Sequence, residues 1–264
     1  MSAPARSAWR SLGLPALTTA VFLGVLLSLG IWQLERKVWK EGLIAAIDAR
    51  AHQAPAAIMP ETSWSSWSGA DEEYRRVRVA GTFLHDGEVR VYGLAEERRG
   101  EPLQGFYVLT PLKLADGAIV FVNRGFVPTE IADPAKRPAG QVAGPVEVVG
   151  LVRAPVGKHL FVPDNEPAKD RWYTRDIPQM AAARGLTRVA PFYIDADASP
   201  NPGNWPRGGQ TQLTVPNNHL GYAITWFSLA AALVAIFVAF SRERLRSPAT
   251  RPAEPVDHAG EAKA

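Results

Sequence analysis

The sequence contains no cysteine among its 264 residues. This absence excludes disulfide scaffolds, thiolate zinc sites, iron–sulfur clusters and copper transfer through thiols. The chain also lacks a Gly-x-Ser-x-Gly elbow, a phosphate-binding loop and a dinucleotide fingerprint. Its five histidines do not pair at metal-ligand spacing, and His85 stands in a His-Asp-Gly turn signal where we expect it to be solvated. We therefore expect a protein that is not an enzyme and has no metal site of its own.

Charged residues make up 21% of the chain, but two stretches contain none: Leu12 to Leu34 and Leu220 to Phe240. At ~1.5 Å per residue, the second stretch forms a helix of ~31 Å, which is the thickness of a bilayer's hydrocarbon core. The first stretch could be a cleaved signal peptide instead. No small-residue cleavage site follows it, and it is longer than the usual signal core. The sequence thus predicts an uncleaved anchor and a second transmembrane helix.

Basic residues around the second stretch predict the orientation, because cytoplasmic flanks carry the excess of arginine and lysine. Only Arg207 lies close before this stretch, whereas Arg242, Arg244, Arg246 and Arg251 follow it. These arginines also account for the net charge of +3 without nucleic-acid binding. The flanks of the first stretch favour the opposite orientation and are given less weight. We expect a multi-pass protein of the bacterial inner membrane with this organisation: 1–11 cytoplasmic, 12–34 transmembrane, 35–219 periplasmic, 220–240 transmembrane and 241–264 cytoplasmic.

Residue patterning changes along the predicted periplasmic segment. Glu35 to His52 has helical periodicity, and from Tyr74 onward apolar residues alternate with polar ones, as in strands. The pair Asp116 and Gly117 predicts a hairpin turn between two strand-like runs. A short helix is expected from Asp176, a capping residue, to Gly185, a stop residue. The fold class predicted is two transmembrane helices flanking an α+β, mostly antiparallel β domain.

His219 opens the second apolar stretch on its outer side. On a helix it shares one face with Tyr222, Ala223 and Trp226, and the end of the first stretch lies at the same depth. An imidazole in such apolar, aromatic surroundings could ligate a haem iron. A histidine at a membrane interface could instead be bonded to water or lipid headgroups, and the chemistry alone favours this interpretation. The residues alone leave both interpretations open.

Five ordered segments resemble motifs of the Surfeit locus protein 1 family. Phe126 is one departure, because the family more often carries tryptophan there. The segments are Gly30–Arg36, Tyr74–Phe83, Gly105–Leu112, Val122–Pro128 and Asn218–Phe227. The resemblance implies an assembly factor for haem-copper cytochrome c oxidase that acts in the maturation of subunit I. It further implies transient binding of haem a, and the histidine that the family links to haem corresponds to His219.

The resemblance also implies partners: oxidase subunit I, the machinery of haem a synthesis or insertion, and the lipid bilayer. In this scheme Tyr222 and Trp226 flank the haem, and Arg36 or Lys37 meets its propionates. The strand containing Arg124 is either a docking edge or an ordinary core strand. A haem-free scaffold for oxidase subunits is an alternative function. A periplasmic sensor is a further one, disfavoured because few residues follow Phe240.

Overall fold

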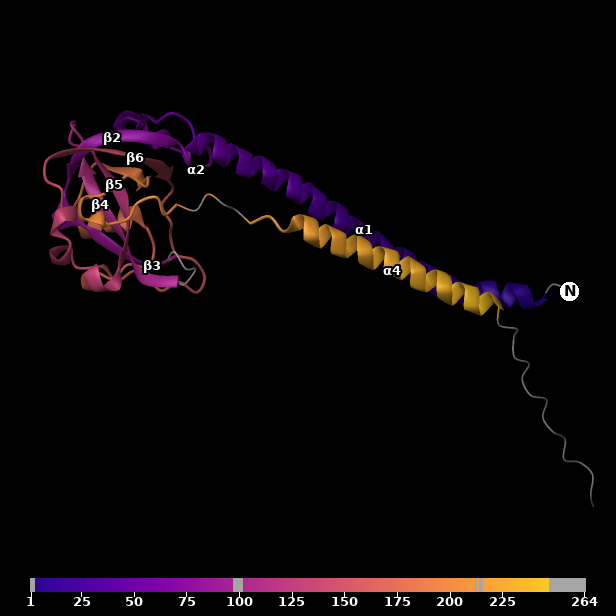
Figure 1. Cartoon of the computed structure of the whole chain (residues 1–264). Helices are drawn as coiled ribbons and strands as arrows, with labels where there is room; N and C mark the ends of the chain where they lie inside the picture. The colour runs from indigo at the N-terminus through magenta and orange to yellow at the C-terminus, as the bar shows by residue number, and fades with distance from the viewer. Residues whose placement is uncertain (1–2, 97–101, 212, 214–215, 247–264) are drawn as a thin grey trace, which may run out of the picture. The chain divides into compact units, whose positions relative to one another are not determined.

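A computed structural model of the chain describes residues 3–96, 102–211, 213 and 216–246. The chain divides into two compact units. A helical unit combines residues 1–42 with residues 216–264, and a second unit comprises residues 43–215 and contains every strand (Figure 1). The prediction for Arg251 and most of the predicted cytoplasmic segment 241–264 lie outside the described residues.

Two long helices carry the apolar stretches. α1 is a single helix over Ala3–Ala51, and α4 covers His219–Arg246. Both are long and apolar enough to cross a membrane. α1 is longer than its apolar stretch because the amphipathic segment from Glu35 onward continues it without a break, as predicted. Within the helical unit the beginning of α1 lies beside the end of α4, so the two helices are antiparallel (Figure 1).

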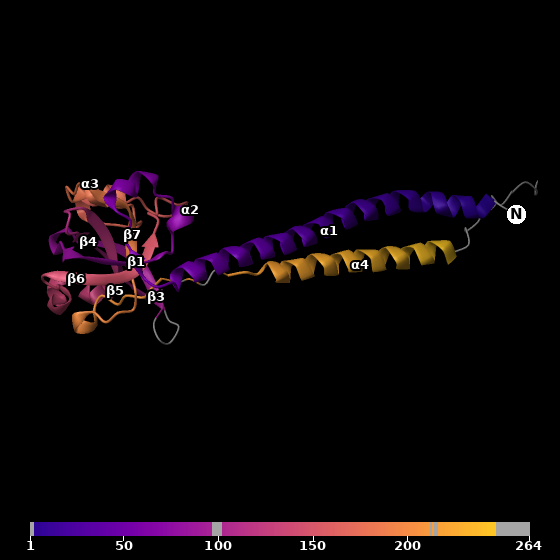
Figure 2. The same ribbon diagram turned by 90° about the horizontal axis from the view of Figure 1, so that it is seen from above.

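The second unit is built on one seven-stranded sheet with the order β1-β2-β6-β7-β5-β4-β3. β2 also pairs with β4, through Thr82 opposite Lys113 and Phe83 opposite Leu112. This extra pairing closes five strands, β2, β6, β7, β5 and β4, into a ring. Figure 2 shows the same unit from above. The strands are β1 Ala56–Ala57, β2 Arg76–Phe83, β3 Val89–Glu96, β4 Pro102–Lys113, β5 Ile119–Pro128, β6 Pro145–Arg153 and β7 Val189–Ala196.

The expected mostly antiparallel sheet is corrected to a mixed one, because β1 pairs with β2, and β5 with β7, in parallel. Parallel neighbours need a long crossover connection. The connection from β5 to β7 contains β6 and α3, so the chain returns to the same end of the sheet before β7 begins. The predicted hairpin between β4 and β5 is confirmed, with Gly117 at a φ of +84° in the turn.

Apolar side chains fill two cores. The first lies among the five ring strands and includes Val122, Val152 and Phe192; Trp64 and Trp67 pack edge-on and tilted against Phe192. The second lies where α3 packs on β3, β4, β5 and β7, around Trp172. β5 takes part in both cores, so its residues Ile119 to Val127 are all buried.

Short helices and turns complete the second unit. α3 covers Ile177–Ala183, and the Asp176 carboxylate accepts a hydrogen bond from the Gln179 amide at 3.0 Å, which confirms the predicted cap. Gly185 follows the helix at a φ of +62°. The others are α2 Gly69–Glu72 and the 3-10 turns Glu61–Ser66, His85–Gly87, Thr129–Ile131, Pro134–Lys136, Pro138–Gly140, Pro167–Lys169 and Pro202–Asn204.

Candidate functional site

The His219 side chain bonds to the other helix of its unit. Its Nδ1 lies 2.7 Å from Oε1 of Gln33 on α1, and both residues are partly buried. An amide oxygen only accepts hydrogen bonds, so Nδ1 carries the hydrogen and donates it. In the neutral ring the lone pair is therefore on Nε2, which has no part in this bond. Gln33 fixes both the tautomer and the orientation of the imidazole, as the second partner of a metal-ligating histidine does.

Close packing of α1 and α4 brings His219 and Gln33 together. Gly30, one turn before Gln33, lies against the ring of Phe227, while Ala223 and Ala230 are buried on α4. Small residues at such a crossing let two helix backbones approach closely. Residues 219, 223, 226, 227 and 230 therefore form one continuous contact stripe along α4, with His219 at the N-terminal end of the helix.

Other residues predicted for the haem site lie as follows. Tyr222 is 58% exposed on α4, and Trp226 is partly buried one turn further. The Arg36 guanidinium stacks on Trp39 at 3.9 Å from the ring centre. Lys37 Nζ bonds Glu41 Oε1 at 2.7 Å. Both residues predicted to bind the propionates therefore already interact with another side chain of α1.

Polar side chains also cluster inside the second unit, around Asp195. This buried carboxylate accepts hydrogen bonds from Asn123 at 2.7 Å, Thr211 at 2.8 Å and Arg153 at 3.0 Å. Burial, and secondarily the charge of Asp195, raises the pKa of nearby Tyr193, so the phenol stays protonated at neutral pH. Both oxygens of Asp195 hold neighbouring segments of the chain together, which supports a structural role. Within the described ranges, no group of three or more histidine, aspartate or glutamate side chains is arranged to hold a metal.

Comparison with known proteins gives the family. The SURF1 family model matches residues 20–231, which is most of the chain. The chain belongs to the SURF1 family. A SURF1-like protein from Monosiga brevicollis is 41% identical over 92% of each chain. Surfeit locus protein 1 of Rattus norvegicus is 38% identical, over 77% of this chain and 68% of the rat protein. Surfeit locus protein 1 of Homo sapiens is 36% identical, over 77% of this chain and 70% of the human protein.

The SURF1-like segments of the sequence lie at two places in the structure. Gly30–Arg36 on α1 and Asn218–Phe227 at the start of α4 contribute the two sides of the His219–Gln33 contact. The other three, Tyr74–Phe83, Gly105–Leu112 and Val122–Pro128, fall on β2, β4 and β5, which are neighbours in the ring. The segments that resemble the family therefore lie at the contact between α1 and α4 and on three neighbouring strands of the ring.

Of the two interpretations of the β5 strand, the ordinary core strand is confirmed and the docking edge is excluded, because Arg124 and Phe126 are each 2% exposed and β5 is paired on both sides. The expectation for His85 is wrong. His85 is not simply solvated, because its Nε2 lies 2.9 Å from the Val142 carbonyl oxygen and its ring packs on Phe83. The sequence predicted that the end of the first apolar stretch lies level with His219, but it did not show the bond between His219 and Gln33. A polar residue within an apolar helix was the available signal.

Gly30 offers a test of the helix crossing. A Cβ added there would lie 2.6 Å from a Phe227 ring carbon, so we expect Gly30→Val to push α1 and α4 apart. Spin labels on introduced cysteines at Ile31 and Ile224, both exposed, should then be further apart by EPR. Gly24→Val is the matched control, because a Cβ there meets no atom within 4 Å. An unchanged distance in the Gly30 variant would contradict the packing described.

Proposed function

We propose that this chain is an assembly factor for cytochrome c oxidase that holds haem a at His219 before the haem enters subunit I. Membership of the SURF1 family supports the assembly role, since members of that family are known as cytochrome c oxidase assembly factors. The observation that carries the haem proposal is the His219–Gln33 hydrogen bond, because it leaves Nε2 as the free nitrogen of an oriented imidazole.

The residues around His219 fit a haem. His219 would hold the haem through Nε2, and the haem would supply redox chemistry once it is in the oxidase. Tyr222 exposes 58% of its surface next to His219 and offers an aromatic face to the macrocycle. Gln33 would keep Nδ1–H engaged and so raise the basicity of Nε2. Arg36 and Lys37 would have to leave Trp39 and Glu41 to meet the propionates.

Gln33 is a positioning residue in this proposal, and its substitution should change haem binding without removing the ligand. Gln33→Leu removes the acceptor for Nδ1–H, so we expect haem a affinity to fall about 10-fold or more, as is typical when such a partner is lost. Gln33→Glu retains an acceptor and should bind near wild-type levels. Titration of purified protein with haem a, followed by absorbance, measures both. Equal affinity of the leucine variant and wild type would contradict the positioning role.

We further propose that the protein lies in a bacterial inner membrane with residues 35–219 in the periplasm. A reporter that works only in the cytoplasm, fused after Ala115, should be silent, and an active fusion would overturn the orientation. Neutralising Arg242, Arg244 and Arg246 should weaken the orientation of α4, since each basic residue near anionic lipid contributes about 1 kcal/mol. Unchanged topology in that variant would assign the orientation to α1 instead.

An exposed loop favours a second function, that of a scaffold for oxidase subunits. Leu160 and Phe161 are 82% and 95% exposed at a loop tip, and Phe161 has a φ of +67°. Large apolar side chains held out in this way are typical of contact surfaces. Phe161→Ser should reduce the amount of subunit I that co-purifies with the protein and leave haem binding unchanged. Full recovery of subunit I would argue against a contact at this loop.

A further inference from the structure

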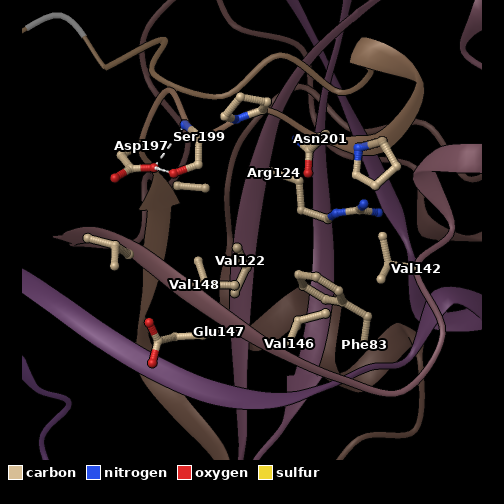
Figure 3. A pocket seen from close by; sticks show the side chains of 14 residues that line it. Phe83, Val122, Arg124, Val142, Val146, Glu147, Val148, Asp197, Ser199 and Asn201 are labelled. Atoms are coloured by element: carbon tan, nitrogen blue, oxygen red, sulfur yellow. Dashed lines mark hydrogen bonds between the residues drawn. The ribbon is translucent and has the colours of Figure 1, made fainter.

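Arg124 lies in a cavity of the second unit, far along the sequence from His219. The cavity has a volume of about 320 Å³ and opens beside β5 and β6 (Figure 3). Phe83, Val122 and Val146 line its apolar side together with Val142. The Arg124 side chain, 2% exposed, extends from β5 along this apolar side. A charged group is thus enclosed by hydrocarbon, where its desolvation is costly unless a counter-charge is bound.

The Arg124 guanidinium uses few of its five N–H donors. Nη2 donates to the Gly140 carbonyl oxygen, and the group stacks 4.6 Å from the centre of the Phe83 ring. Nε and Nη1 are buried and have no hydrogen-bond partner. In the described part of the chain, no carboxylate oxygen lies within 4.0 Å of Arg124. Two buried donors therefore remain without a partner. The Nε–H and Nη1–H bonds diverge, so a bidentate carboxylate would use one of them together with the second hydrogen of Nη2.

Neighbouring charges leave one positive charge uncompensated. Arg137 forms a buried ion pair with Glu88, and these two residues cancel each other. Two buried arginines with one buried glutamate have a net charge of +1. Burial lowers the pKa of Arg124 to about 10, so the group is still charged at neutral pH.

Acidic residues that line the same cavity lie on its other side. Asp197 and Glu147 are separated from the Arg124 guanidinium by the apolar floor (Figure 3). Each faces an arginine of β2: Asp197 lies 3.6 Å from Arg76, and Glu147 lies 3.5 Å from Arg78. These pairs are locally neutral and do not supply a counter-ion to Arg124.

We propose that this cavity binds a small aliphatic carboxylate, whose charged group pairs with Arg124 and whose hydrocarbon part contacts Phe83 and the valines. One unit of negative charge matches the net charge of +1, whereas a phosphate monoester dianion would exceed it. The volume of the cavity suits a short chain. The same chemistry occurs in a free fatty acid and in the C-terminal carboxylate of a polypeptide that ends in an aliphatic residue.

Equilibrium dialysis of radiolabelled hexanoate against the full chain in lipid nanodiscs tests the proposal, with empty nanodiscs as the blank. We expect saturable binding that hexan-1-ol and inorganic phosphate do not displace. Arg124→Met should weaken binding at least 10-fold. Arg171→Met is the matched control, because it removes an arginine that is 60% exposed in its side chain and does not line this cavity, and it should bind within twofold of wild type.

A second variant keeps the test decisive if Arg124→Met does not fold. Val146→Phe retains the arginine but fills part of the cavity, so it too should lose hexanoate binding. N-acetyl-leucine binding more tightly than hexanoate would support the site with a polypeptide terminus as its ligand, and the reverse order would support it with a free fatty acid. Non-saturable binding, displacement by phosphate, or unchanged binding by folded Arg124→Met and Val146→Phe would overturn the proposal.

Discussion

Replacing His219 by alanine is expected to remove most of the haem a that co-purifies with the protein, and to lower the haem content of the oxidase with it. His219 is the only histidine in α1 and α4, so the variant has no other imidazole ligand in either helix. The loss of one hydrogen bond to Gln33 costs about 1 kcal/mol, which is too little to prevent insertion of α4. Abundance in membranes should therefore stay near wild type while the absorbance of haem a falls sharply.

His52→Ala is the control for this experiment. His52 follows the last residue of α1, and its Nδ1 lies 3.2 Å from the Asp48 carboxylate oxygen Oδ1. Both side chains are 69% exposed. It belongs to neither contact face of the helices, so its removal should leave the spectrum unchanged. A wild-type haem spectrum in His219→Ala would mean that His219 is only an interfacial histidine. The scaffold function would then account for the assembly role.

Replacing Gly125 by alanine is expected to destabilise the second unit more than any other glycine-to-alanine substitution in it. Gly125 has a φ of +117°, a region that side chains avoid. A Cβ at this position would lie 1.8 Å from the carbonyl oxygen of Arg207, whose amide and carbonyl pair with Phe126. The backbone must move and break this bridge, so we expect a loss of about 3 kcal/mol or more. Chemical denaturation of the purified chain, followed by near-UV circular dichroism, measures it.

Gly144→Ala separates backbone strain from the clash. Gly144 also has a positive φ, +81°, but a Cβ there meets no atom within 4 Å. Its replacement should cost about 1 kcal/mol, the price of the left-handed conformation alone. Equal losses in the two variants would contradict the close contact between β5 and the Arg207 segment.

Local signals in the sequence predicted local structure well. The cap at Asp176, the glycine stop at Gly185 and the turn at Gly117 each act over a few residues, and all three lie where expected. The two apolar stretches likewise predicted α1 and α4, because helix periodicity and length depend on consecutive residues. The continuation of α1 through Glu35 followed from the same periodicity.

Long-range pairings could not be predicted in this way. The ring closes because Thr82 lies opposite Lys113, and neither residue shows its partner in its own sequence neighbourhood. Parallel pairing of β5 with β7 likewise depends on the path of the intervening chain. The bond between Gln33 and His219 joins residues that are 186 positions apart in the sequence. The predicted membrane depth of the two apolar stretches put them at one level but did not show that these side chains are in contact. The sequence indicated only that Arg124 belongs to a strand. That its charge is buried beside a cavity is known from its exposure in the structure.

The most direct test of the assembly role is the haem a content of cytochrome c oxidase in cells from which the gene for this chain has been deleted. Reduced-minus-oxidised absorbance spectra of membranes, together with immunodetection of subunit I, give the haem a bound per subunit. We predict that this ratio falls sharply after deletion, that the wild-type gene restores it, and that the His219→Ala gene does not. Unchanged haem a per subunit I in the deletion strain would contradict the proposed function.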